Sequence, residues 1–306
     1  MNTTILEQYY KSLNIPRDCK EFLLYGQNVT EISRGLELGA NVNFFFVNTK
    51  GIEDPTPLIF ACMCKNYDIT KFLLENGANP NLSTNSNNAL HIVTHTDDFD
   101  FFELMVQYGA NINQIDSKQN TPLIIASNYG YKDIVDFLLE QNVNIEHRNN
   151  FGETALFVAC KNNKIDIVNT LISHGANVHI KNHGEINLLM TVAEQIGDMI
   201  QLFDTLILAG LIEFDLQNNA GQTALILACE NNNFFIAERL IQLNCDVNLK
   251  TKKGYDALSR ALKNSNLQLI KLLIEHGAYI ALNIQYNRNF IMTKKEIKNY
   301  LLEQIK

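Results

Sequence analysis

The stretch Thr121–Ala126, which reads T-P-L-I-I-A, decides the fold because the same phrase returns along the chain at a nearly constant spacing. Three close copies and three weaker copies share this pattern, and they begin at Thr56, Asn88, Thr154, Ile186, Thr223 and Asp256. Read in order from residue 56, the seven starting points are 32, 33, 33, 32, 37 and 33 residues apart. A period near 33 residues predicts a solenoid of stacked repeats, and a solenoid normally presents a binding surface.

A second phrase keeps a fixed distance behind the first. It reads F-L-L-E-N-G-A-N-P-N at Phe72–Asn81. Its other versions lie at Gly35–Asn43, Leu104–Asn113, Phe137–Glu146, Thr170–His179, Leu240–Asn248 and Leu272–Ile280. Two phrases that stay in phase across most of the chain define one repeating unit rather than a chance match.

One unit can be interpreted from its residues as turn, helix, turn, helix. Thr121 precedes Pro122, which predicts a threonine N-cap followed by proline at the first helical position. Residues 128–130 should end this short apolar helix, and Asp133 should open a second one with a single buried face. Asn142 stands at the helix end, where other units carry glycine in a left-handed turn. Neither helix can bury its apolar face alone, so the units must stack.

These two phrases resemble the T-P-L-H-x-A signature and the G-A-x-x-N turn of the ankyrin-repeat family. The resemblance covers roughly residues 17 to 282. It implies an all-α solenoid of paired antiparallel helices with β-turn fingers, capped at both ends. It also implies an L-shaped stack whose concave face is formed by the fingers and by the first helix of each unit.

The expected organisation has three parts. Residues 1–43 should form N-terminal capping helices with a degenerate repeat, residues 44–282 seven ankyrin repeats, and residues 283–306 a C-terminal capping helix. Thr293-x-x-Glu296 is a capping-box pattern that should open the last helix. In the first finger, Phe44, Phe45 and Phe46 cannot all face inward, because neighbouring residues of an extended strand alternate.

One repeat, at about residues 181–217, is irregular. Counting from its phrase places three extra residues between Val192 and Gly210, and one more between Gly210 and Thr223. The first interpretation is a longer second helix tolerated on the outer face. The alternative is a seam that bends the stack or adds a contact site.

Composition and charge limit the function. The chain is 46% apolar and 19% charged, with a net charge of −8 and a pI near 5.4, which count against nucleic-acid binding. Lys250, Lys252 and Lys253 cluster in the last finger, where an acidic patch on a partner would fit. Neither a membrane span nor a secretory signal is visible, so we expect a cytoplasmic protein, and a monomer is the default for a capped solenoid.

The cysteines and histidines fit structural roles better than chemical ones. The chain has six cysteines, and Cys62, Cys160 and Cys229 share one repeat position that suits a small buried side chain. Half of a metal site at Cys62-x-Cys64 is the weaker alternative, since no second pair lies at zinc spacing. His91 should make a local hydrogen bond. We therefore expect no cofactor, no metal and no catalytic residue.

Two classes of function are consistent with this sequence. The first is an adaptor that binds a protein partner through its concave surface, with no chemistry of its own. The second is a microbial or viral effector, or a ligase-recruiting receptor, in which a terminal segment docks an enzyme.

The resemblance implies contacts at the fingers and at the ends of the first helices. The residues at such positions are Ser117, Lys118, Asn120, Tyr129, Asn150, Phe151, Glu153, Lys161, His183, Glu185, Lys252 and Lys253. Phe151 and Tyr129 should be anchors, because the scaffold does not need an aromatic side chain at a finger tip or a helix end. The alternative for Phe151 is that it folds over its own finger.

Overall fold

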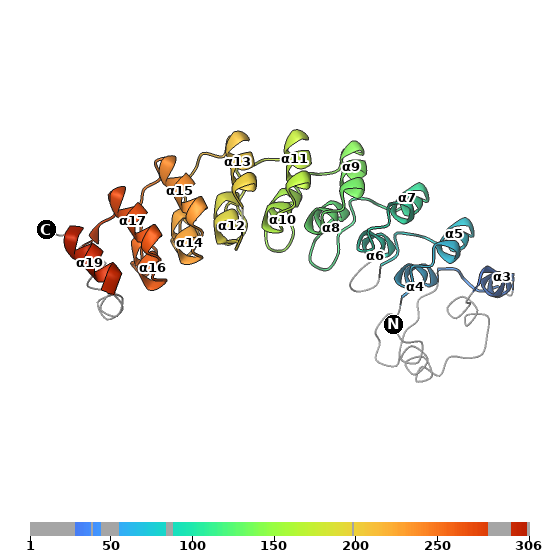
Figure 1. Cartoon of the computed structure of the whole chain (residues 1–306). Helices are drawn as coiled ribbons and strands as arrows, with labels where there is room; N and C mark the ends of the chain where they lie inside the picture. The colour runs from blue at the N-terminus through green and yellow to red at the C-terminus, as the bar shows by residue number, and fades with distance from the viewer. Residues whose placement is uncertain are drawn as a thin grey trace. The chain divides into compact units, whose positions relative to one another are not determined.

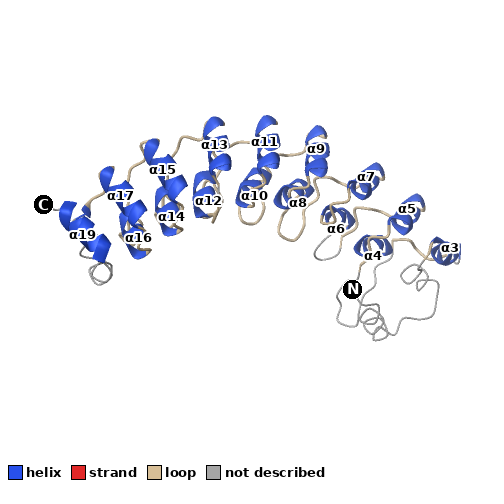
Figure 2. Cartoon of the chain, in the orientation of Figure 1, coloured by secondary structure: helices blue, strands red, loops and turns tan. Residues whose placement is uncertain are grey.

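The computed structural model describes residues 28–37, 39–43, 55–83, 88–197, 199–280 and 295–304. Within these ranges the chain forms sixteen helices (Figure 1). Its extended pairings there are two isolated bridges, between Ser83 and Asn88 and between Lys181 and Asn187. Figure 2 accordingly shows helices joined by loops in the described part of the chain. The expected all-α class is confirmed.

The chain divides into two compact units. The first comprises residues 1–126 and 131–144, and the second comprises residues 127–130 and 145–306. The helices of the first unit are α3 (Val29–Glu37), α4 (Pro57–Met63), α5 (Tyr67–Glu75), α6 (Ala89–Thr94), α7 (Phe99–Gln107) and α9 (Lys132–Glu140). Helix α8 (Pro122–Tyr129) begins in the first unit and ends in the second.

The second unit repeats a pair of helices four times. Its helices are α10 (Ala155–Lys161), α11 (Ile165–Ser173), α12 (Leu188–Glu194), α13 (Ile200–Leu208), α14 (Ala224–Glu230), α15 (Phe234–Gln242), α16 (Ala257–Lys263), α17 (Leu267–Glu275) and α19 (Lys295–Gln304). The first helices α10, α12, α14 and α16 pack in one row, and the second helices α11, α13, α15 and α17 pack in another (Figure 1). In the first unit, α4 packs on α6, and α3 packs on α5 as the second helix of an incomplete pair would.

A side-chain N-cap starts each first helix. Thr154 Oγ1, for example, accepts the Phe157 N–H at 3.3 Å. The residues with this role are Thr56, Asn88, Thr121, Thr154, Asn187, Thr223 and Asp256. Threonine, asparagine and aspartate are interchangeable here because each offers an oxygen to an N–H that has no partner within the helix.

This capping position corrects the register of the irregular repeat. Asn187, and not Ile186, accepts the Met190 N–H at 2.9 Å, so the repeat begins one residue later than its phrase suggested. The steps on either side are therefore 187 − 154 = 33 and 223 − 187 = 36 residues. Three residues, rather than four, are extra in this repeat.

The expectation of a longer second helix was wrong. Helix α13 has nine residues, the same as α11 and α15. Two of the extra residues lie in the loop before it, since α12 and α13 begin 200 − 188 = 12 residues apart whereas α10 and α11 begin 165 − 155 = 10 apart. The third lies between Gly210 and Thr223. A loop accepts added residues at little entropic cost, whereas a longer helix would have to break its packing.

The core consists of the faces that the pairs turn toward one another. In α10, every residue from Ala155 to Cys160 is buried. In α9 the buried residues are the predicted Ile134, Val135, Leu138 and Leu139. The positions of the helix ends differ slightly from expectation: α9 starts at Lys132, one residue before Asp133, and α8 runs to Tyr129, so Gly130 ends it. Asn142 has φ 54, which confirms its left-handed turn.

Cys62, Cys160 and Cys229 are buried as small apolar side chains, as predicted. Burial raises the pKa of the Cys62 thiol to about 12, and it also raises the pKa values of Cys160 and Cys229. These thiols therefore stay protonated and pack as small side chains.

Several expectations fall outside the described residues. They are the part of the N-terminal capping segment before residue 28, the Phe44–Phe46 finger and the Thr293 end of the capping box. Helix α19 buries Ile297 and Leu301, and the Lys271 ammonium of α17 lies 5.5 Å from the ring centre of Tyr300. A capping role for either end stays a prediction. None of the helices in the described ranges combines the length and the apolar character needed to cross a bilayer.

Candidate protein-binding surface

Four finger tips share one hydrogen-bond pattern, and the last finger keeps one of its two bonds. In one finger, Asn149 Oδ1 accepts the N–H groups of Phe151 and Glu153, at 2.9 and 3.0 Å. Asp116, Asn182 and Asn218 bond the second and fourth residues that follow them in the same way. Thr251 Oγ1 accepts the Tyr255 N–H at 3.0 Å. The backbone of each tip is thus fixed by one short polar side chain.

Neighbouring fingers of the second unit are also joined to one another. His183 donates its N–H to Phe151 O at 2.9 Å, Asn219 to Gly184 O at 3.0 Å, and Lys252 to Ala220 O at 3.0 Å. We call this series of backbone bonds the finger ladder. Because it uses only the backbone, the side chains at the tips are left to vary.

Gly152 shows how closely the fingers approach. Its φ is 75, and a Cβ placed there would lie 2.6 Å from His183 Cδ2 and 2.9 Å from the His183 backbone nitrogen. Glycine is required at this position both by the left-handed backbone and by the neighbouring finger.

The two predicted aromatic anchors are exposed. Phe151 is 59% exposed and Tyr129 is 47% exposed, and both belong to the second unit. Tyr129 ends α8, and its neighbour Asn128 accepts a hydrogen bond from Asn162 at the end of α10, at 2.9 Å. The helix ends of these two repeats are therefore adjacent. Large exposed aromatic side chains on a fixed backbone are typical of interface anchors.

Glu153 differs from the expectation that it would meet a partner. Its carboxylate is almost fully buried and lies 2.8 Å from Lys161 Nζ. The Lys161 side chain is half exposed, so Glu153 orients a lysine that solvent and partners can reach. Glu153 is thus a supporting residue, and Lys161 is the residue that presents charge.

The remaining predicted residues divide between the units. Ser117 and Lys118 are exposed and Asn120 is partly buried, all in the finger that belongs to the first unit. Asn120 donates to Asp116 Oδ2 at 2.9 Å. Of the other predicted residues, those in the second unit's fingers are all exposed: Asn150, His183, Glu185, Lys252 and Lys253. Glu185 has φ 59 and takes the place of Gly152 in its finger, and it lies 3.4 Å from Lys181 Nζ.

A polar cluster in the last two pairs escaped the sequence analysis. The Arg260 guanidinium lies 4.5 Å from the ring centre of Tyr255 and 3.5 Å from Glu230 Oε1. Gln222 donates to the other oxygen of Glu230 at 3.0 Å. Gln222 and Glu230 stand in the positions that Glu153 and Lys161 occupy in their own repeat. Aligning the repeats on their cap residues would have revealed this correspondence.

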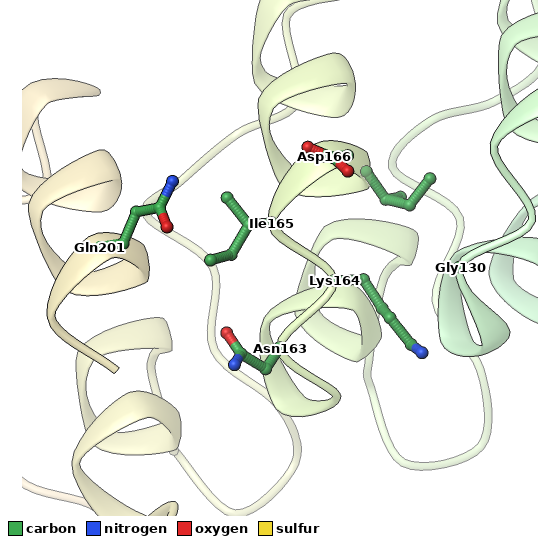
Figure 3. Close-up of a pocket in the computed structure, with 7 residues that line it drawn as sticks. Gly130, Asn163, Lys164, Ile165, Asp166 and Gln201 are labelled. Atoms are coloured by element: carbon green, nitrogen blue, oxygen red, sulfur yellow. The ribbon is translucent and has the colours of Figure 1, made fainter. Parts of the chain in front are cut away.

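A shallow groove lies away from the fingers, at the start of the second helices (Figure 3). Its volume is about 370 Å³, and it is lined by Gly130, residues 163–167 and Gln201. The Lys164 side chain crosses Gly130, whose missing Cβ would lie 2.9 Å from Lys164 Cδ. No predicted site residue lines this groove.

The histidines have local partners. His91 Nε2 lies 3.0 Å from Gln114 O, His174 Nδ1 lies 2.8 Å from Thr170 O, and His179 Nδ1 lies 3.2 Å from Glu213. Burial lowers the pKa of His91. In the part of the chain that the structure describes, no three histidine, cysteine or carboxylate side chains converge as they would around a metal ion.

Comparison with known proteins agrees with this architecture. A family model for ankyrin repeats matches residues 19–116, 93–182 and 189–284. The chain is 33% identical to an ankyrin repeat protein of Fowlpox virus (strain NVSL) over 79 residues, 25% of this chain and 13% of that protein. It is 37% identical to one of Acanthamoeba polyphaga mimivirus over 81 residues, 26% of this chain and 18% of that protein. The chain thus spans less than a fifth of the length of either viral relative.

A solved structure extends the similarity to three dimensions. It is a chain from a complex of a predatory endopeptidase of Bdellovibrio bacteriovorus with an immunity protein. It matches 62% of this chain and 98% of its own length, with 34% identity and a TM-score of 0.56. Ankyrin repeats are a protein–protein interaction module that generally carries no catalytic activity. The paired helices, the capped first helices and the family match together show that the chain belongs to the ankyrin-repeat family.

Proposed function

We propose that this protein is a binding scaffold that holds a protein partner on the finger surface of its second unit, without chemistry of its own. The finger surface comprises the exposed tips after Asn149, Asn182, Asn218 and Thr251, with Tyr129 and Lys161 at the helix ends. On this surface Phe151 and Tyr129 act as anchors, and Lys252 and Lys253 meet acidic groups of the partner.

The observation that carries the proposal is the contrast between backbone and side chains in the fingers. In successive fingers the asparagine that opens the tip accepts the same backbone N–H groups, and the finger ladder joins adjacent tips. The exposed side chains on this fixed frame nevertheless differ: Phe151 in one finger, His183 in the next, and Lys252 in the last. A rigid frame lowers the entropic cost of binding, and its varied side chains provide specificity.

The alternative function is that of an effector or a ligase-recruiting receptor. Two observations favour keeping it: the ankyrin relatives of Fowlpox virus and of a mimivirus, and the similarity to a chain from an endopeptidase–immunity protein complex. In this alternative the finger surface still holds a target, and a terminal segment docks an enzyme.

The function is proposed for a monomer in the cytoplasm. The described cysteines, Cys62, Cys64, Cys160, Cys229 and Cys245, are all free, which suits a reducing compartment. A single copy would suffice, because every element of the finger surface comes from one chain.

Site-specific photocrosslinking tests the proposal. A photoreactive phenylalanine analogue at Phe151, or at Lys253, should yield discrete covalent adducts with a partner protein in cells. The same analogue at Gln268, an exposed residue of α17, should yield none. Adducts absent from both finger positions would contradict the proposed surface. A ligase subunit captured by the analogue at Glu296, an exposed residue of α19, would favour the alternative.

A further inference from the structure

Three strongly exposed large apolar side chains lie in the irregular repeat. Leu208 is 89% exposed, Ile196 is 87% exposed and Ile212 is 67% exposed, and these are the three most exposed large apolar side chains among the described residues. Leu208 is the last residue of α13, and Ile212 follows it across the turn at Gly210, where φ is 95. Ile196 lies in the loop at the other end of α13.

The other repeats provide an internal reference for these positions. The second helices end on polar residues elsewhere: Glu75, Gln107, Glu140, Ser173, Gln242 and Glu275. Two residues after the turn glycine, or its replacement, the other repeats carry Asn41, Asn79, Asn111, Asn144, Asn177, Asp246 and Tyr279. The fold therefore does not need an apolar side chain at either position, and both positions became apolar in the same repeat.

The hydrogen bonding around Ile212 has changed as well. Elsewhere an oxygen of the preceding repeat accepts the N–H at this position, as Glu146 does for Asn177 at 2.7 Å. In the irregular repeat the corresponding residue, His179, lies 3.2 Å from the carboxylate of Glu213 instead. The change leaves Ile212 on the surface beside an acidic residue.

Acidic residues lie in the same turn as Ile212 and in the corresponding turn of the next repeat. Asp215 follows Ile212 by three residues, and its Oδ1 accepts the Asp246 N–H at 2.8 Å. Both aspartates are exposed, and no lysine or arginine of the described residues forms a salt bridge with either of them. The pKa of the buried Cys245 thiol is raised to about 12 by burial and, in addition, by these two carboxylates. We call Leu208, Ile212, Glu213, Asp215 and Asp246 the α13 patch.

We propose that the α13 patch is a second docking surface, which takes a basic segment of a partner protein that also carries an apolar side chain. Leu208 and Ile212 remove the apolar side chain from water, and the carboxylates attract the lysine and arginine residues that flank it. An anionic membrane surface fits less well, because the same carboxylates would repel its headgroups. Leu208 ends α13, and the other residues of the patch lie in the turns that follow α13 and α15. The patch therefore shares no residue with the finger surface.

The test uses the full chain and a displayed library of random linear peptides. The wild-type chain should enrich peptides that combine lysine or arginine with leucine, isoleucine or phenylalanine. One enriched peptide is then synthesised, and its affinity is measured by calorimetry against purified variants whose folding is verified by thermal unfolding.

The variants borrow residues that other repeats already tolerate. Leu208→Gln with Ile212→Asn removes the apolar surface, and Asp215→Asn with Asp246→Asn removes two charges while keeping the hydrogen-bond acceptors. Each pair should raise the Kd about tenfold or more. Two controls should leave the Kd unchanged: Ile196→Gln, which removes an equally exposed side chain at the other end of α13, and Phe151→Ala on the finger surface.

Three results would overturn the proposal. One is that no peptide is enriched, or that the enriched peptides are acidic. Another is that the Kd is the same in the Leu208→Gln/Ile212→Asn variant as in the wild type. The third is that the chain co-sediments with vesicles of phosphatidylcholine and phosphatidylserine in a way that Leu208→Gln/Ile212→Asn abolishes, which would make the patch a membrane contact.

Discussion

At the residue scale, His91 shows how this fold uses a titratable side chain for structure. The ring is buried, and its Nε2 faces the Gln114 carbonyl at 3.0 Å, so the neutral ring donates to that oxygen. Burial lowers the pKa of His91, because an imidazolium in this position would lose its hydration. His91 therefore takes up a proton less readily in the folded chain than in the unfolded chain.

This difference predicts a loss of stability in mild acid. An unfolded histidine takes up its proton near pH 6.5, whereas the folded His91 does so only at lower pH. Between these values the unfolded state binds more protons, so the free energy of unfolding is highest above about pH 6.5 and falls as the pH drops through that window. Urea unfolding at a series of pH values should show this slope. In His91→Gln, whose amide can still donate to Gln114 O, the slope should be shallower, and an unchanged slope would assign it to other groups.

A comparison of two glycines should separate the energetic cost of backbone strain from the cost of a close contact. Gly152 and Gly175 both have positive φ, 75 and 84, but only Gly152 has a neighbour where a Cβ would lie. Gly175→Ala should cost about 1–2 kcal/mol from strain alone. Gly152→Ala should cost about 1–3 kcal/mol more, because the His183 backbone must move. Chemical denaturation of both variants measures the difference in the free energy of unfolding. Equal losses would mean that the neighbouring finger moves away from the added Cβ at little cost.

At the element scale, the first helices depend on their caps. Asn187 caps α12, so Asn187→Ala should cost about 0.5–2 kcal/mol, and Asn187→Thr should restore most of the loss. Unfolding midpoints of the two variants compare them directly. If alanine and threonine are equally destabilising, the side-chain cap does not stabilise α12 and the register of this repeat needs revision.

Truncation of a buried side chain inside a first helix should destabilise the fold far more than loss of an N-cap. Leu156 is fully buried in α10, so Leu156→Ala should cost about 2–5 kcal/mol through lost burial and the cavity that remains. Cys160→Ala, in the same helix, removes a smaller side chain and should cost clearly less. Denaturation curves for the pair would contradict this account if the two losses were the same.

At the scale of the whole molecule, binding and stability should be separable. Phe151 and Tyr129 are exposed, so their truncation should remove the proposed contacts with a partner and disturb the fold little. With the crosslinked partner identified and purified, Phe151→Ala and Tyr129→Ala should each weaken binding by about 1–3 kcal/mol while the Tm stays nearly constant. Calorimetry and thermal unfolding provide the two measurements. Unchanged affinity in both variants would exclude these anchors.

Most of the fold was predictable because each repeat contains its own helix-capping and turn residues. Thr154 and Thr223 mark helix starts, and Asn142 marks a left-handed turn, using only nearby atoms. The register near Asn187 was missed because the adjacent Leu188 and Leu189 can both be matched to the leucine of the phrase, and the match to Leu188 makes Ile186 the start. Glu153 was misjudged for a different reason: its buried carboxylate pairs with Lys161, eight residues further on, which no single-position pattern reports. Exposure of Phe151 was foreseeable, but the identity of a partner is not encoded in any single repeat.

The finger ladder has an evolutionary consequence. Every joint of the ladder uses the same two backbone atoms, an N–H at the first tip residue of one finger and a carbonyl at the second tip residue of its neighbour. Neither atom belongs to a side chain, so these hydrogen bonds do not themselves restrict which second-unit repeat follows another. Recombination that duplicates or deletes a whole period of the second unit should therefore keep the joints. Insertions of other lengths must fall where no joint exists, as those of the irregular repeat do: in the loop before α13 and beyond Gly210.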